Sequence, residues 1–180
     1  MRAFIAIELP SELKEKIDNV ISELEDADFC DAKWVSEEKL HLTCKFLGEI
    51  NKEQAETVKS VLADISKHQN SFNLPLGGIG QFNERILWVG GNSKDCIKLA
   101  GEIDTELSKL GFAKEEREFS IHLTLARIRY IKDKIKFQQI LKKYASKDFG
   151  SFKVDKIKLM ESILSAEGPI YRELASFDLI

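Results

Sequence analysis

Two of the three histidines in this 180-residue chain lie in the same tripeptide, His-Leu-Thr, at positions 41–43 and 122–124. A neutral imidazole near pH 7 can take a proton from an attacking water, and a protonated one can donate to a leaving oxygen. Threonine hydroxyls can donate hydrogen bonds to phosphate oxygens, whose charge grows in the transition state. His41 and His122 are therefore the candidate catalytic pair for phosphodiester chemistry, and Thr43 and Thr124 the candidate substrate-binding residues.

Both tripeptides lie in runs that alternate with period two, as a half-buried strand does. In "LHLTCKFL" the alternation predicts one face of Leu40, Leu42, Cys44 and Phe46, and an opposite face of His41, Thr43 and Lys45. The run "SIHLTLA" predicts the same separation for His122 and Thr124. Each strand would thus bury apolar residues and present a His-Thr pair on its other face.

The fifth residue after each histidine differs between the two copies, being Phe46 in one and Arg127 in the other. An arginine can clamp a phosphate with two hydrogen bonds, and an aromatic ring can stack on a base. Strict alternation places both on the apolar face, so core packing is an equal alternative for Phe46. Because a buried arginine needs a partner, we expect a bulge or twist near Ala126 that turns Arg127 to the cleft.

A metal site is the rival interpretation, but we expect neither a metal nor another cofactor. A catalytic zinc usually takes three protein ligands, and no Asp, Glu or Cys stands at a repeated position beside the two histidines. His68, the third histidine, is expected at the surface or at a helix end. A mechanism with a Ser or Cys nucleophile and a His base remains an alternative, although no nucleophile elbow of the Gly-x-Ser-x-Gly type is present.

The elements that must position these residues repeat with the histidines. Helices are predicted to begin near residues 11, 51, 93 and 133, and seven strands near 2–9, 39–47, 72–82, 85–91, 119–128, 152–160 and 171–180. Each His-Leu-Thr strand has one helix beginning about 30 residues before it and another about 10 after it. The spacing predicts an α+β fold of two similar lobes, each an antiparallel sheet with two helices on one face. If the two lobes face each other, both His-Thr pairs point into the same cleft.

The chain is expected to be a single two-lobed domain, 1–180, built of units near 1–75 and 76–180, with exchange of terminal strands between the lobes left open. It is 43% hydrophobic and 32% charged, with a net charge of −3, which disfavours a large basic surface for duplex DNA. Its three cysteines have no Cys-x-x-Cys spacing and predict buried thiols. With no apolar run long enough for a signal peptide or a membrane span, we expect a cytoplasmic monomer without membrane contact.

With these motifs the sequence resembles the two-histidine phosphoesterase superfamily, and in particular the LigT-type RNA 2′,3′-cyclic phosphodiesterases, also called 2′-5′ RNA ligases. The resemblance rests on "MRAFIAIEL", "HLTCKFLGEI", "HLTLAR" and "GPIYRELASFDL", which span essentially the whole chain. It implies a bilobal, pseudo-two-fold fold with the active-site cleft between the lobes. It also implies a metal-independent acid–base pair, His41 and His122, with Thr43 and Thr124 orienting the phosphate. It also implies a phosphate-binding Arg127 and a base-contacting Phe46.

The implied reaction opens a terminal 2′,3′-cyclic phosphate of RNA to a 2′-phosphate, with 2′-5′ ligation in reverse. We assign His122 as the base for water and His41 as the acid for the 3′-oxygen. The substrate would be an RNA end or a nucleotide that carries a 2′,3′-cyclic phosphate. Two alternatives stay open: an enzyme for a small cyclic nucleotide or an ADP-ribose cyclic phosphate, and an RNA-end binding module without turnover.

Overall fold

The structure is a computed structural model that describes residues 1–166 and 168–180. Within these residues the elements are, in chain order, β1 (Arg2–Glu8), α1 (Ser11–Asp26), β2 (Cys30–Trp34), a 3-10 turn (Glu37–Lys39), β3 (His41–Glu49), α2 (Lys52–Ser66), β4 (Phe72–Phe82), β5 (Ile86–Gly91), α3 (Lys94–Ser108), β6 (His122–Ile131), α4 (Lys134–Tyr144), β7 (Asp148–Val154), β8 (Lys156–Ser165) and β9 (Gly168–Asp178).

The strands form two antiparallel sheets, which confirms the predicted α+β class. Sheet A has the strand order β3-β1-β8-β9, and sheet B has the order β2-β6-β5-β4-β7. The histidine strand β3 pairs with β1 at the edge of sheet A, and the histidine strand β6 pairs with β5 and is flanked by the short β2. Strands β8 and β9, from the end of the chain, lie in the sheet of β1 and β3. The division into units near 1–75 and 76–180 stays a prediction.

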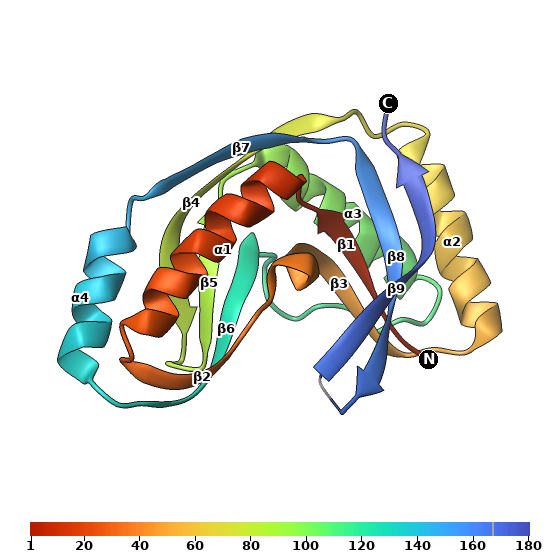
Figure 1. Cartoon of the computed structure of the whole chain (residues 1–180). Helices are drawn as coiled ribbons and strands as arrows, with labels where there is room; N and C mark the ends of the chain where they lie inside the picture. Colours follow the sequence, from red (N-terminus) through yellow and green to blue (C-terminus); the bar gives the residue numbers. More distant parts are fainter. Residues whose placement is uncertain (167) are drawn as a thin grey trace.

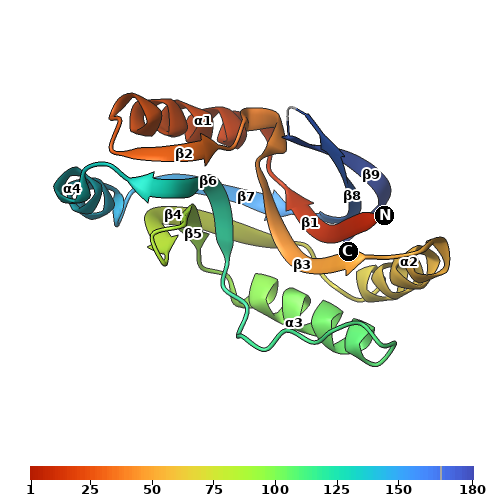
Figure 2. The same ribbon diagram turned by 90° about the horizontal axis from the view of Figure 1, so that it is seen from below.

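Two helices cover the outer face of each sheet. Helix α2 packs against α3, β8 and β9, and α3 also contacts β3 (Figure 1). Helices α1 and α4 cover sheet B, where the Tyr144 hydroxyl donates to the Glu23 carboxylate at 2.7 Å. Seen from below, α1 and α3 lie on opposite sides of the molecule, as a pseudo-two-fold arrangement requires (Figure 2).

Most predicted boundaries are confirmed, and the exceptions have local causes. The side chains of Asn51, Ser93 and Asp133 cap α2, α3 and α4 by accepting hydrogen bonds from backbone N–H groups, as Asn, Ser and Asp do. Ser11 does not cap α1, because Pro10 is the capping residue and Ser11 is already helical. The predicted strand 152–160 is two strands, β7 and β8, and the short β2 is missing from the prediction.

A matched irregularity interrupts both histidine strands. Opposite β1, the register passes from Thr43 to Lys45, so Cys44 is an extra residue without a cross-strand partner. Opposite β5, the register passes from Thr124 to Ala126, so Leu125 is the extra residue. A β-bulge of this kind reverses the alternation of faces beyond it. The expected bulge near Ala126 is thereby confirmed, and β3 has a bulge at the equivalent position.

The first bulge also corrects the face predicted for Lys45. Its side chain is 1% exposed and points toward α3, where Nζ binds an Asp104 carboxylate oxygen at 2.6 Å and the Ala113 carbonyl at 2.8 Å. Glu115 lies 3.9 Å from the same ammonium. Lys45 is therefore absent from the cleft face and joins β3 to α3 and to the segment that leads to His122.

Replacing Lys45 with Met is expected to lower the free energy of unfolding by about 3 kcal/mol, because it leaves a partly buried carboxylate and a carbonyl without their partner. The matched control is Lys59→Met, which removes an i,i+3 pair with Glu56 on the outer surface of α2 and should cost less than about 0.5 kcal/mol. Urea unfolding of the three proteins measures both values. Equal losses in the two variants would contradict the anchoring role of Lys45.

Candidate active site

His41 begins β3 and is held by two hydrogen bonds. Its Nδ1 lies 2.7 Å from the Lys39 carbonyl oxygen, and its Nε2 lies 3.1 Å from the Thr43 hydroxyl. A carbonyl only accepts, so the proton of the neutral ring is on Nδ1. Nε2 then accepts a hydrogen bond from Thr43 when the ring is neutral and can donate when it is protonated.

His122 begins β6 and repeats this arrangement. Its Nδ1 lies 2.8 Å from the carbonyl oxygen of Ser120, again the residue two positions earlier. Both imidazoles thus have the same tautomer and leave Nε2 as the reactive nitrogen. Each histidine is half-buried and shares a strand face with its threonine, as the alternation predicts.

Aromatic side chains surround both imidazoles. The His41 ring centroid lies 5.0 Å from that of Phe4 and 5.1 Å from that of Tyr171. The His122 ring has an edge contact with Phe82, with 5.2 Å between centroids. These rings limit the rotation of the imidazoles and reduce the access of water to their faces.

The bulges turn the fifth residue after each histidine to the side of that histidine. Phe46 is 61% exposed, and its ring lies 6.2 Å from Phe4, which itself contacts His41. The core-packing alternative for Phe46 is therefore wrong. Arg127 is exposed. Burial raises the pKa of Tyr171, and the charge of Arg127 acts in the opposite direction. All six predicted site residues, His41, Thr43, Phe46, His122, Thr124 and Arg127, lie on the inner faces of the sheets.

The two halves meet along the histidine strands. Strands β3 and β6 contact each other across the boundary between the sheets. Tyr171 of sheet A touches His41 and is close enough to Arg127 of sheet B for the guanidinium charge to act on its phenol. The two histidine strands therefore lie next to each other where the two sheets meet.

A carboxylate stands beside His41. Glu8 pairs directly with His41 across β1 and β3, and it shares the ammonium of Lys158 with Glu173. Burial lowers the pKa of His41, whereas the hydrogen bond to Lys39 and the Glu8 charge act in the opposite direction. The hydrogen bond from Lys158 holds the pKa of Glu8 below its ordinary value, so this carboxylate is ionised at neutral pH.

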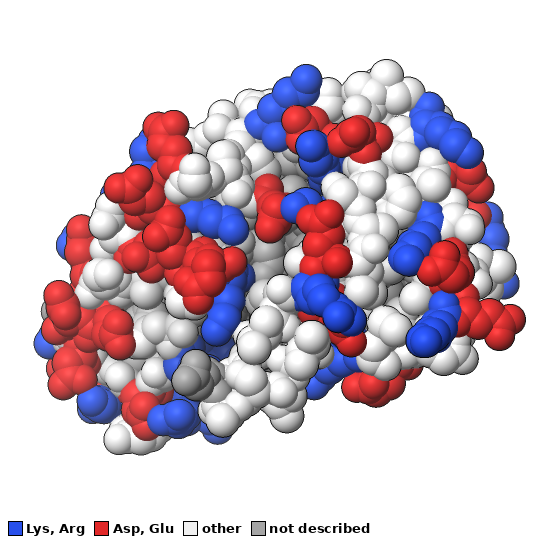
Figure 3. Space-filling model, turned by 45° about the vertical axis from the view of Figure 1, so that its right-hand side comes forward, with Lys and Arg blue, Asp and Glu red and all other residues white. Residues whose placement is uncertain are grey.

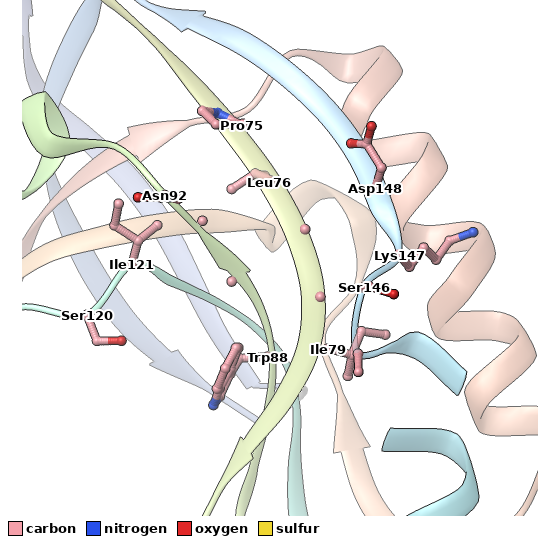
Figure 4. A pocket seen from close by; sticks show the side chains of 15 residues that line it. Pro75, Leu76, Ile79, Trp88, Asn92, Ser120, Ile121, Ser146, Lys147 and Asp148 are labelled. Carbon is pink, nitrogen blue, oxygen red and sulfur yellow. The ribbon is translucent and has the colours of Figure 1, made fainter. Parts of the chain in front are cut away.

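One hollow contains His41, and a second lies on sheet B next to the residues that precede His122. A small one of about 80 Å³ lies against His41 and is lined by Phe4, Glu8, Met160 and Tyr171 among others. A wider one of about 720 Å³ lies on sheet B beside Ser120, where Trp88 and Ser120 stand on one side of β4 and Ser146 and Asp148 on the other (Figure 4). Lys147 also borders it, but its side chain points away from β4.

Charged side chains of both signs occur on the face seen in Figure 3. Acidic ones predominate on the left of that view, and the two signs are interspersed on the right. Among the described residues no three His, Cys, Asp or Glu side chains gather as metal ligands, and no helix is long and apolar enough to span a membrane.

Three contributors to the site are missing from the sequence-based prediction: Phe4, Glu8 and Tyr171. The alternation in the first strand does carry a signal, because Phe4 and Glu8 share a period-two face. What it lacks is the pairing of Glu8 with His41, which depends on the register of β1 with β3. Tyr171 is contributed by the hairpin of β8 and β9, which no local pattern connects to His41.

Comparison with known proteins identifies a family and a shared fold. Residues 4–179 match the sequence model of the family described as the AKAP7 2′5′ RNA ligase-like domain. An RNA 2′,3′-cyclic phosphodiesterase of Methanocaldococcus jannaschii is 36% identical over 175 residues, which are 95% of this chain and 96% of the relative. The structure of Escherichia coli LigT complexed with 3′-AMP aligns with a TM-score of 0.79 at 25% identity, over 99% of this chain and 97% of that one. The TT0787 protein of Thermus thermophilus shares the fold, with a TM-score of 0.85 at 24% identity over 99% and 98% of the two chains.

Glu8→Gln is expected to lower the pKa of His41, because the variant removes a negative charge that stabilises the imidazolium. NMR titration of the imidazole resonances measures this shift. Glu38→Gln is the matched control, since Glu38 lines the same small hollow but bonds to Ser36. A pKa of His41 that is unchanged or raised in Glu8→Gln would contradict the role given to Glu8.

Proposed function

The chain belongs to the 2′5′ RNA ligase-like family of two-histidine phosphoesterases, and on that premise we propose how it acts as an RNA 2′,3′-cyclic phosphodiesterase. The observation that supports the proposal most is the matched pair of imidazoles, each oriented through Nδ1 by a carbonyl two residues earlier. Two nitrogens with the same tautomer on either half of one cleft suit a reaction with two proton transfers. A binding module would need no such pair of titratable groups.

In the proposed reaction, Nε2 of His122 takes a proton from a water molecule as the water oxygen attacks the phosphorus. The bond between phosphorus and the 3′-oxygen breaks, and Nε2 of His41 donates a proton to that oxygen. The product has a 3′-hydroxyl and a 2′-phosphate. A 5′-hydroxyl of a second RNA in place of water would give a 2′-5′ linkage through the same transfers.

The acid role requires that His41 be protonated when the substrate is bound. Burial works against the imidazolium in the free protein. The Glu8 carboxylate beside the ring and a negatively charged phosphate in the cleft both favour it, because an opposite charge nearby stabilises the charged form. We therefore keep His41 as the acid and assign Glu8 as the residue that supports its protonation.

The remaining residues are proposed to bind the substrate. Thr43 and Thr124 each share a face with a catalytic histidine, where a hydroxyl can donate to a non-bridging oxygen of the phosphate. The exposed guanidinium of Arg127 offers two parallel donors to the phosphate. Phe46, exposed beside Phe4, offers a face on which the terminal base can stack.

We also propose a cytoplasmic monomer. All three cysteines are buried free thiols, and burial raises the pKa of Cys96 to about 12, which keeps it unreactive and suits a reducing compartment. One chain supplies both histidines and their threonines, so the proposed site needs no second copy.

His41→Ala and His122→Ala are each expected to lower kcat by about 100-fold or more on an RNA with a 2′,3′-cyclic phosphate end, because each removes one proton transfer. The assay contains excess chelator and follows formation of the 2′-phosphate. His68→Ala is the matched control, since His68 is exposed, pairs with Glu102 and should be dispensable. Absence of ring opening by the wild type, or ring opening that survives both catalytic substitutions, would refute the proposal.

A further inference from the structure

Strand β2 places Lys33, a cation with no role in the proposed reaction, beside the site. Lys33 pairs directly with Arg127 across β2 and β6. Directly paired residues of antiparallel strands project from the same face of the sheet, so Lys33 shares the cleft face with Arg127. Like charges in such a pair destabilise the sheet. A negatively charged group bound between Lys33 and Arg127 would offset this repulsion.

Within the described residues, Arg129 of β6 and Lys132, which directly follows β6, have carboxylate partners, but Lys33 and Arg127 form no ion pair. Arg129 lies 3.2 Å from a carboxylate oxygen of Asp31, and Lys132 lies 2.5 Å from one of Asp28. Both Lys33 and Arg127 are exposed. An anion can therefore reach both side chains from solvent.

Both cations lie where sheet A comes over sheet B. A Cβ added to Gly168, at the start of β9, would be 3.0 Å from Nζ of Lys33. Arg127 is close enough to Tyr171, also on β9, for its charge to act on the phenol. Since β2 is the edge strand of sheet B, Lys33 lies one strand beyond β6, toward the outside of the cleft.

We propose that Lys33 binds the phosphodiester on the 5′ side of the terminal nucleotide of an RNA strand. The proposal rests on the proposed function, in which Arg127 holds the terminal phosphate. Two cations on neighbouring strands then hold successive phosphates of one strand. The favoured substrate is a single-stranded RNA of at least two nucleotides, because a mononucleotide has no phosphate to place at Lys33.

Binding tests this site independently of turnover. The probe is a fluorescent RNA trinucleotide that ends in a 2′-phosphate, titrated with wild-type protein, Lys33→Gln and Lys33→Arg at several salt concentrations. Lys33→Gln should weaken binding at low ionic strength by at least about threefold and reduce the slope of log Kd against log salt by about 0.7, the value for one contact with a single strand. Lys33→Arg should restore both.

The matched control is Lys142→Gln, which removes the same charge from the exposed face of α4 on the opposite side of sheet B. It should leave the slope unchanged. Displacement of the probe by a nucleoside 2′-phosphate gives the affinity for a single nucleotide in each variant. Loss of affinity for both ligands in equal measure, or an unchanged slope in Lys33→Gln, would overturn the proposal.

Turnover by wild-type protein of an RNA trinucleotide that ends in a 2′,3′-cyclic phosphate reports on the proposed function alone. Failure of that reaction with a normal salt effect at Lys33 would refute the enzyme and retain the phosphate site. Normal turnover without the salt effect would refute the phosphate site at Lys33 and retain the proposed enzyme.

Discussion

One extra residue in each histidine strand determines how the site is built. If the strands ran without the bulges at Cys44 and Leu125, strict alternation would bury the residue five positions after each histidine. The bulges instead bring Phe46 and Arg127 to the cleft, while Lys45 is turned away into its ion pair with Asp104. Each strand can therefore present three functional side chains and still cover its helices with apolar ones.

The matched bulges and the matched carbonyl hydrogen bonds make the two halves alike, and their differences indicate a division of labour. His41 stands among aromatic rings with Glu8 beside it, whereas His122 is followed by Arg127 and its neighbour Lys33. In the proposed reaction, the first half stacks on the nucleobase and donates a proton to the leaving oxygen, and the second half binds the phosphate groups. Tyr171 connects them, because it contacts one imidazole and lies within reach of the arginine charge of the other half.

Local patterns predict most of the fold and the centre of the site. Period two indicates the faces of His41 and His122, and helical periodicity with capping residues indicates the four helices. The short β2 is missed because its five residues are too few for a period-two pattern. Lys33 becomes a candidate for phosphate binding only through its pairing with Arg127, which the sequence does not show. Glu8 likewise needs the register of β1 with β3. Such cross-strand pairs depend on long-range contacts that a local period does not contain.

The central claim is that the two imidazoles act in opposite protonation states, and the pH dependence of kcat/KM for ring opening of an RNA cyclic phosphate tests it most directly. The account predicts a bell-shaped profile for the wild type. The acidic limb reports the base and should disappear in the residual activity of His122→Ala, and the basic limb reports the acid and should disappear in that of His41→Ala. Both limbs persisting in both variants would contradict the account.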